Sequence, residues 1–135
     1  MNIDEIKLGD MASTTKTISE SDVYLFAGIT GDMNPAHTDD VTASKGLFKG
    51  RVAHGILVTG LISAVLGMKL PGPGTIYLGQ EVKFTKPVYF GDTITATCTV
   101  ASMRTEKNIV NLDTICVNQK GETVITGSAT VMPPK

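Results

Sequence analysis

The chain has 135 residues, and its 12 Lys and Arg residues against 13 Asp and Glu residues give a formal net charge of −1. This length is typical of one domain, so we expect residues 1–135 to form a single domain with its own hydrophobic core. The near-neutral charge and an aromatic content of 5% argue against nucleic-acid binding, which needs a basic face and stacking side chains.

The N-terminal part predicts a strand, a helix and a long loop. Residues 11–18 are rich in Thr and favour a short strand. Ser19 followed by Asp22 is a capping box, which predicts a helix that ends at the glycines from Gly28 onward. Residues 31–50 predict an irregular loop, and a loop of this length in a compact domain is usually functional. The first residues carry no apolar run typical of secretory signals, so the expected location is cytoplasmic.

An uncharged stretch lies between Arg51 and Lys69 and is rich in Leu, Ile, Val and Ala. It reaches only the lower length limit of a membrane span, about 17 residues, and it contains His54 and several glycines. We therefore expect a buried central helix over residues 53–69 and no membrane segment. A Pro-Gly-Pro-Gly segment that starts at Pro71 ends this helix.

The second half of the sequence changes to the period of strands. Thr residues alternate with apolar residues over 93–100, the pattern of an antiparallel strand with one buried face. Further strands are predicted over residues 81–88, 109–117 and 123–131. Helices followed by a run of strands predict an α+β fold, in which an antiparallel sheet wraps around the central helix.

The loop carries the first candidate site. Asp32 and His37 lie on either side of a turn at Asn34-Pro35. A carboxylate and an imidazole that share a water form a general acid–base pair, and Asn34 is expected to fix the turn by bonding its own backbone. In the alternative interpretation, Asp32 and Asn34 are only turn residues and His37 is a solvated side chain. We expect no metal here, because two histidines without a nearby cysteine are too few ligands for a closed zinc site.

The second candidate site is the start of the central helix, at His54 and Gly55. A helix N-terminus offers free backbone N–H groups, and a glycine there lets a carbonyl oxygen approach closely, as in an oxyanion site. The alternative for His54 is a capping or packing role. Ser63, about two turns further along, either faces the ligand or bonds back to its own helix.

Residues 24–37 read Tyr-Leu-Phe-Ala-Gly-Ile-Thr-Gly-Asp-Met-Asn-Pro-Ala-His, which closely resembles the signature of the R-specific enoyl-CoA hydratases, the MaoC-like or hydratase-2 family. Further blocks similar to this family follow in the family order, at residues 52–57, 70–72, 76–80 and 86–92. The resemblance covers essentially the whole chain, and the Gly-Asp-x-Asn-Pro-x-His core is its specific part.

The resemblance implies a hot-dog fold, in which a curved antiparallel sheet wraps around a long apolar helix. It implies reversible syn hydration of trans-2-enoyl-CoA, of short to medium chain length, to (R)-3-hydroxyacyl-CoA. In this reaction Asp32 and His37 activate the water, and the backbone N–H of Gly55 binds the thioester oxygen. Neither a metal nor a separate cofactor is expected, since CoA is part of the substrate.

The resemblance also bears on the substrate contacts and the partners. The expected substrate-binding residues are Asn34, Ser63 and Leu66. The expected partners are an acyl-CoA thioester and further copies of the chain, in a homodimer or higher homo-oligomer whose interface would help to explain a charged content of only 19%. The candidates for contacts with the CoA phosphates are Lys45, Lys49, Arg51 and Arg104.

Two other functions remain open at this point. A hot-dog acyl-CoA thioesterase would hydrolyse the same class of substrate, and release of a free thiol from acyl-CoA would reveal it. A non-catalytic acyl-CoA-binding module would be stabilised by CoA thioesters without turning them over. Function has to be argued from the site, because the fold alone does not decide between these alternatives.

Overall fold

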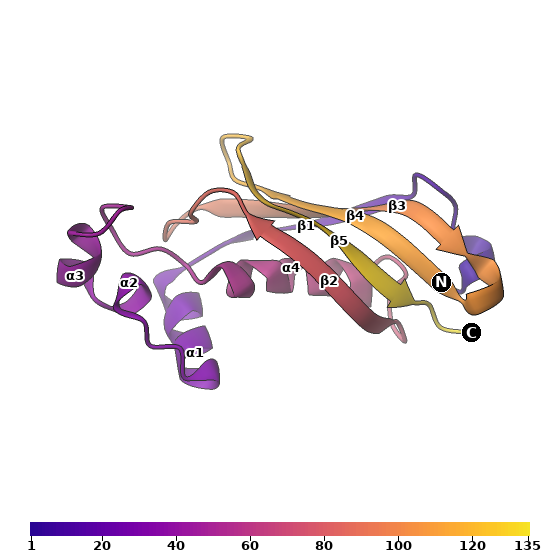
Figure 1. Ribbon diagram of the computed structural model, residues 1–135, viewed down its shortest axis with the longest axis horizontal. Helices are drawn as coiled ribbons and strands as arrows, with labels where there is room; N and C mark the ends of the chain where they lie inside the picture. The colour runs from indigo at the N-terminus through magenta and orange to yellow at the C-terminus, as the bar shows by residue number, and fades with distance from the viewer.

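The computed structural model describes residues 1–135 and contains a five-stranded sheet that lies over a long helix, α4 (Figure 1). The elements in chain order are η1 (Ile3–Glu5), β1 (Met11–Thr17), α1 (Glu20–Thr30), α2 (Pro35–Thr38), α3 (Asp40–Ser44), α4 (Gly55–Met68), β2 (Ile76–Phe84), β3 (Thr93–Arg104), η2 (Thr105–Lys107), β4 (Ile109–Val117) and β5 (Thr123–Met132). The strand order is β1-β3-β4-β5-β2, and all neighbouring strands are antiparallel. The predicted α+β architecture is confirmed.

Helix α4 packs against the sheet and forms the centre of the core. Its Val58, Ile62 and Val65 are fully buried and belong to one cluster with strand residues such as Ile94 and Leu112. The helix begins and ends within one or two residues of the predicted bounds 53–69, which is the usual uncertainty of helix ends. No helix of the chain is both long enough and apolar enough to span a membrane.

The alternation in β3 separates the two faces of the sheet as predicted. Ile94, Cys98 and Val100 are buried in the core. The Thr side chains point to the other face, where the hydroxyls of Thr95 and Thr15 of β1 form a hydrogen bond of 2.8 Å. Burial raises the pKa of the Cys98 thiol to about 12, so this side chain remains protonated and behaves as a small apolar group.

The predicted bounds of one strand, β2, are wrong. It covers Ile76–Phe84 instead of 81–88. A bulge between Tyr77 and Gly79 interrupts the alternation of inward and outward side chains. The first residues of β2 therefore lack the alternating sequence pattern by which a strand is predicted. The residues after β2 leave the sheet, and the carbonyl oxygen of Val88 accepts a hydrogen bond of 2.7 Å from the N–H of Ala53. This hydrogen bond joins the segment after β2 to the residues that lead into α4.

Helices α1, α2 and α3 gather at one end of the sheet, beside the start of α4 (Figure 1). The capping box that begins α1 is confirmed, because Ser19 and Asp22 each accept a hydrogen bond from the backbone N–H of the other. Residues 31–50, predicted as an irregular loop, contain α2 and α3. These short helices form because the side chains of Asn34 and Asp39 accept hydrogen bonds from their first N–H groups.

Arg51 ties this group of helices together. Its guanidinium donates to Asp40 at 2.6 Å and to Glu20 at 3.2 Å. It also lies 5.7 Å from the ring centre of Tyr24 and 4.7 Å from that of Phe90. Because its charge is already neutralised by two carboxylates, Arg51 holds the helices at the end of the sheet. A contact between Arg51 and the CoA phosphates stays a prediction.

Candidate active site

Asp32 and His37 come together where α1, α2 and the start of α4 meet. Asp32 follows Gly31, whose φ of +80° ends α1 and turns the chain, and His37 lies within α2. A carboxylate oxygen of Asp32 and one ring nitrogen from each of His37 and His54 lie within 4.8 Å of one another. The two residues therefore converge, as the hypothesis of an acid–base pair requires.

Local hydrogen bonds fix the backbone and carboxylate of Asp32. Its N–H donates to the hydroxyl oxygen of Thr30 at 3.1 Å, and its Oδ1 accepts from the N–H of Asn34 at 3.3 Å. Asn34 Oδ1 in turn accepts from the N–H of Ala36 at 3.0 Å. Asn34 thus fixes the turn with its side-chain oxygen, as expected, and the amide nitrogen is the group that remains for a substrate contact. The side chain of Asp32 is 49% exposed and accessible to a ligand.

The ring of His37 is held in one tautomer. Its Nδ1 lies 2.6 Å from the carbonyl oxygen of Val52. A carbonyl oxygen only accepts hydrogen bonds, so Nδ1 carries a proton and donates it. In the neutral ring, Nε2 then carries the free lone pair, which can accept a hydrogen bond from a water or a substrate.

His54 is a member of this cluster that the sequence did not place there. Its ring is stacked on that of His37, with centroids 3.8 Å apart and an angle of 28° between the planes. Its Nε2 lies 3.0 Å from the carbonyl oxygen of Asp32. Although His54 occupies the N-cap position of α4, its side chain makes no capping hydrogen bond, so the capping alternative is wrong. One signal was available in the sequence: the chain has only two histidines, and both lie here.

The start of α4 forms one wall of a cavity beside His37. The cavity has a volume of about 300 Å³ and is lined mainly by apolar side chains, together with His37, Gly55 and Lys86. Gly55 is the first residue of α4, so its N–H has no acceptor within the helix. A Cβ atom on Gly55 would lie 2.5 Å from Cδ1 of Phe84, so a larger residue at this position would force the Phe84 ring or the start of the helix to move. The geometry offers a backbone donor beside an imidazole.

The structure separates Ser63 and Leu66 from this cavity. Ser63 is exposed and lines a groove of about 400 Å³ between α4 and β2, which it shares with Thr59, Tyr77 and Gln80. Burial raises the pKa of the Tyr77 phenol to about 12, so it stays protonated and donates to the side-chain oxygen of Gln80. Leu66 is 1% exposed and packs in the core. It contacts neither the groove nor the cavity in this single chain.

The cluster of Asp32, His37 and His54 has the residue types of a metal site, but its hydrogen bonds do not suit one. The Nε2 of His54 faces the carbonyl oxygen of Asp32 and therefore carries a proton, which leaves it no lone pair for a metal. Nδ1 of His37 is committed to Val52 in the same way. His37 Nε2, the carboxylate of Asp32 and the buried Nδ1 of His54 remain, which is fewer than the four ligands of a closed site.

A basic residue near the cavity was missed by the sequence analysis. Lys86 lines the cavity, and its Nζ forms an ion pair of 2.6 Å with Glu122. Lys45 and Lys49 lie exposed at and after the end of α3. Arg104 is the last residue of β3, a strand that ends at the far end of the sheet from α1–α3 (Figure 1), so it lies outside this site.

The sequence of the chain matches a known protein family over most of its length. Residues 7–120 match the family described as the MaoC like domain. The chain belongs to the MaoC-like family. The family resemblance noted in the sequence is therefore confirmed, and the site described above lies within the matched residues.

Relatives and solved structures of this family cover nearly the whole chain. An (R)-specific enoyl-CoA hydratase of Rhodospirillum rubrum is 54% identical over 97% of this chain and 90% of its own length. A 3-hydroxybutyryl-CoA dehydratase of Methylorubrum extorquens is 41% identical over 98% of this chain and 83% of its own. The unliganded R-hydratase PhaJ1 of Pseudomonas aeruginosa superimposes with a TM-score of 0.92 at 44% identity, covering 98% of this chain and 84% of that one. An R-hydratase of Aeromonas caviae has a TM-score of 0.92 at 38% identity, with coverages of 96% and 98%. These likenesses confirm the hot-dog fold.

Proposed function

We propose that this protein is an R-specific enoyl-CoA hydratase. It adds water reversibly, in syn geometry, across the double bond of trans-2-enoyl-CoA and forms (R)-3-hydroxyacyl-CoA. The observation that carries the proposal is the convergence of Asp32 and His37 beside a cavity whose wall contains the first residue of α4. The names of the Rhodospirillum rubrum and Aeromonas caviae relatives support the same reaction.

The start of α4 activates the substrate. The N–H of Gly55 donates to the thioester carbonyl oxygen, and the positive end of the helix dipole stabilises the negative charge that grows there. Polarisation of this carbonyl withdraws electrons from the double bond and makes the β-carbon electrophilic. The apolar lining of the cavity strengthens the interaction, because few other dipoles compete with the N–H group.

Asp32 and His37 supply the water. The lone pair of His37 Nε2 accepts a hydrogen bond from the water, and the carboxylate of Asp32 takes a proton from it as its oxygen bonds to the β-carbon. The electron pair of the double bond moves toward the thioester and forms the enolate. Collapse of the enolate then takes a proton at the α-carbon, returned from the pair on the same face. The reverse sequence releases water from the hydroxyacyl thioester.

The reaction draws on these groups and on the CoA thioester, and we propose no metal and no separate cofactor. The acyl chain is of short to medium length. Its path is proposed to follow the groove beside Ser63, since this groove is lined by Ile56, the residue next to Gly55. A cytoplasmic location stays a prediction.

We also propose that the protein is a homodimer joined through β2 and α4. β2 is an edge strand, and its Ile76, Leu78 and Phe84 side chains are exposed. A long apolar edge strand with unpaired backbone groups favours pairing with a second chain. The exposed face of α4 beside it carries small side chains, at Gly60, Ser63 and Ala64, that permit close approach of another helix. Pairing of the two β2 edges would cover the groove beside Ser63.

Hydration of crotonyl-CoA, followed by chiral analysis of the product, tests the proposed reaction. We expect (R)-3-hydroxybutyryl-CoA from the wild type, and loss of activity without loss of fold from Asp32→Asn and His37→Gln. A mostly (S) product, or either variant acting at the wild-type rate, would contradict the proposal. A thiol reagent in the same assay distinguishes hydrolysis, because a thioesterase releases free CoA. Stabilisation by butyryl-CoA without any turnover of crotonyl-CoA would indicate a binding module instead.

A further inference from the structure

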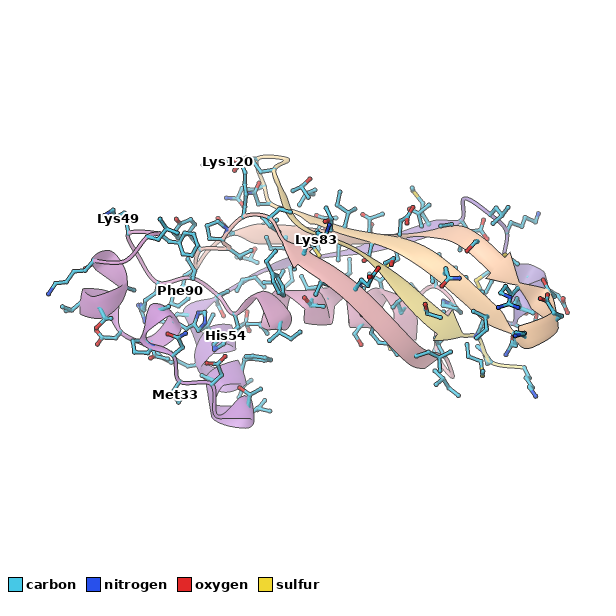
Figure 2. The ribbon with its side chains drawn as sticks, in the orientation of Figure 1. Met33, Lys49, His54, Lys83, Phe90 and Lys120 are labelled. Atoms are coloured by element: carbon cyan, nitrogen blue, oxygen red, sulfur yellow. The ribbon has the colours of Figure 1, made fainter.

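His54 contacts both residues of the proposed acid–base pair, each with a different part of its ring. The side chain is 2% exposed and lies where α1 and α2 meet the start of α4 (Figure 2). The Nε2 edge faces the carbonyl oxygen of Asp32 at 3.0 Å, and the ring face is stacked on His37 at 3.8 Å. Phe26 of α1 packs at 4.8 Å with a tilted ring. These contacts restrict the imidazole to one orientation.

The hydrogen bond to Asp32 joins segments that are far apart in the sequence. Because the carbonyl oxygen of Asp32 can only accept, Nε2 of His54 carries the proton. Asp32 directly follows the left-handed Gly31, at the point where α1 has ended and no helical hydrogen bond holds its carbonyl group. The N–H of His54 therefore anchors the backbone of Asp32 to the start of α4, the same place where Gly55 presents its own N–H.

The other ring nitrogen shows that His54 is more than a packing residue. Its Nδ1 is buried and has no hydrogen-bond partner. A buried acceptor without a donor is destabilising, and an apolar ring of similar size would avoid the cost. The imidazole is therefore explained by what its Nε2–H does, because packing alone does not require a nitrogen at either position.

We propose that His54 is a positioning residue for the hydration reaction. Its Nε2–H fixes the distance between Asp32 and the start of α4, and its ring face sets the plane of His37. His54 is absent from the lining of the cavity beside Gly55, so it acts through these neighbours and does not touch the substrate. The inference rests on the proposed hydratase function, since the geometry that His54 maintains is that of the pair which holds the water.

Two substitutions of His54 distinguish the contribution of its Nε2–H group from that of its aromatic ring. His54→Phe keeps an aromatic face against His37 and removes the donor to Asp32. We expect kcat for crotonyl-CoA hydration to fall about 10²-fold, the effect of displacing a catalytic group by roughly 1 Å, while KM stays within about twofold because substrate contacts are retained. His54→Gln places an amide N–H near the position of Nε2, and we expect it to recover most of the lost kcat.

If His54→Phe does not fold, the comparison of His54→Gln with His54→Asn still tests the positioning role. The side chain of Gln reaches the position of Nε2, whereas the side chain of Asn reaches only that of Nδ1. We expect His54→Gln to retain much higher kcat than His54→Asn. Equal kcat values for this pair, or wild-type kcat for a folded His54→Phe, would overturn the positioning role. The wild type in the same assay distinguishes failure of the hydratase proposal from failure of the His54 proposal. An inactive wild type refutes the hydratase function. An active wild type whose His54 variants have unchanged kcat refutes only the role of His54.

Discussion

The Nδ1–H of His37 donates a hydrogen bond of 2.6 Å to the carbonyl oxygen of Val52, which lies 15 residues further along the chain. This bond selects the tautomer of the imidazole and directs Nε2 away from the backbone. It also ties α2 to the segment that leads into α4. The sequence suggested that His37 is a candidate base, and the contact with Val52 identifies the nitrogen that would act.

His37→Asn tests this assignment of the two nitrogens. The Asn amide can still donate near the position of Nδ1 and bond Val52, but it has no group at the position of Nε2. We expect kcat for crotonyl-CoA to fall by about 10²- to 10⁴-fold, the usual contribution of a general acid–base group, with a melting temperature close to that of the wild type. Thermal melts alongside kinetics check both parts. Full activity in the Asn variant would show that Nε2 takes no part.

Gly55→Ala is expected to disturb the start of α4. The added Cβ would lie 2.5 Å from Cδ1 of Phe84, so either the ring or the helix start must move and the donor N–H shifts with it. We expect kcat/KM to fall about 10²-fold, as for loss of an oxyanion donor. The double variant Gly55→Ala with Phe84→Leu removes the ring atoms in conflict and should regain part of the activity.

Gly28→Ala is the matched control for the glycine substitution. Gly28 lies in α1, and a Cβ atom there meets nothing within 4 Å. The variant should keep wild-type kinetics and gain about 0.5–1 kcal/mol in the free energy of unfolding, because Ala loses less backbone freedom than Gly in a helix. Urea titration measures this gain. If Gly55→Ala were as active as Gly28→Ala, the added Cβ would be accommodated by movement of the Phe84 ring, and the expected displacement of the N–H of residue 55 would be wrong.

The proposed dimer predicts a solution mass of twice the 14.3 kDa of the chain. Leu78→Lys places a charge on the exposed edge strand β2, and we expect it to shift the protein toward monomer in light scattering. Leu8→Lys is the control, because Leu8 is also exposed but lies before β1, away from that edge. A monomeric wild type, or equal behaviour of the two variants, would contradict an interface at β2.

The capping box at the start of α1 should produce a pH-dependent stability. Hydrogen bonds from Lys16 and from the Ser19 N–H hold the pKa of Asp22 below its ordinary value of 3.8. A carboxyl group with a lowered folded-state pKa stabilises the fold above its unfolded-state pKa, and this stabilisation is lost as the pH falls through the folded-state value. Asp22→Asn should therefore have a lower melting temperature than the wild type at pH 7.

The same pair of proteins compared over a pH series completes this test. The difference in melting temperature should be constant above about pH 5 and should shrink as the pH falls below 3.8, where the wild-type carboxylate becomes protonated. A difference that is unchanged at pH 2 would mean that the Asn variant loses stability for a reason other than charge. Calorimetry measures the melting temperatures of the wild type and of Asp22→Asn. The ionic strength has to be the same at every pH, because salt screens the interaction between Asp22 and Lys16.

Features that depend on neighbours in the chain were predictable from the sequence. The capping box at Ser19 and the alternation over 93–100 were both found where expected. The same holds for the central helix, because an uncharged apolar run of this length is stable only when it is buried. The turn at Asn34-Pro35 was sufficient to suggest that Asp32 and His37 converge, since a short turn leaves few other arrangements.

Only the tertiary structure decided the contacts between distant segments. The side chain of His54 reaches the carbonyl of Asp32, 22 residues earlier, and Arg51 is bound by the carboxylates of Glu20 and Asp40. Helix α4 is apolar on every side, so its sequence did not indicate that Ser63 would face outward while Leu66 packs in the core. Local rules of capping and periodicity determine which elements form and which residues carry the chemistry. The packing of the sheet on α4 determines which of those residues meet, because burial and long-range hydrogen bonds exist only once the chain has folded.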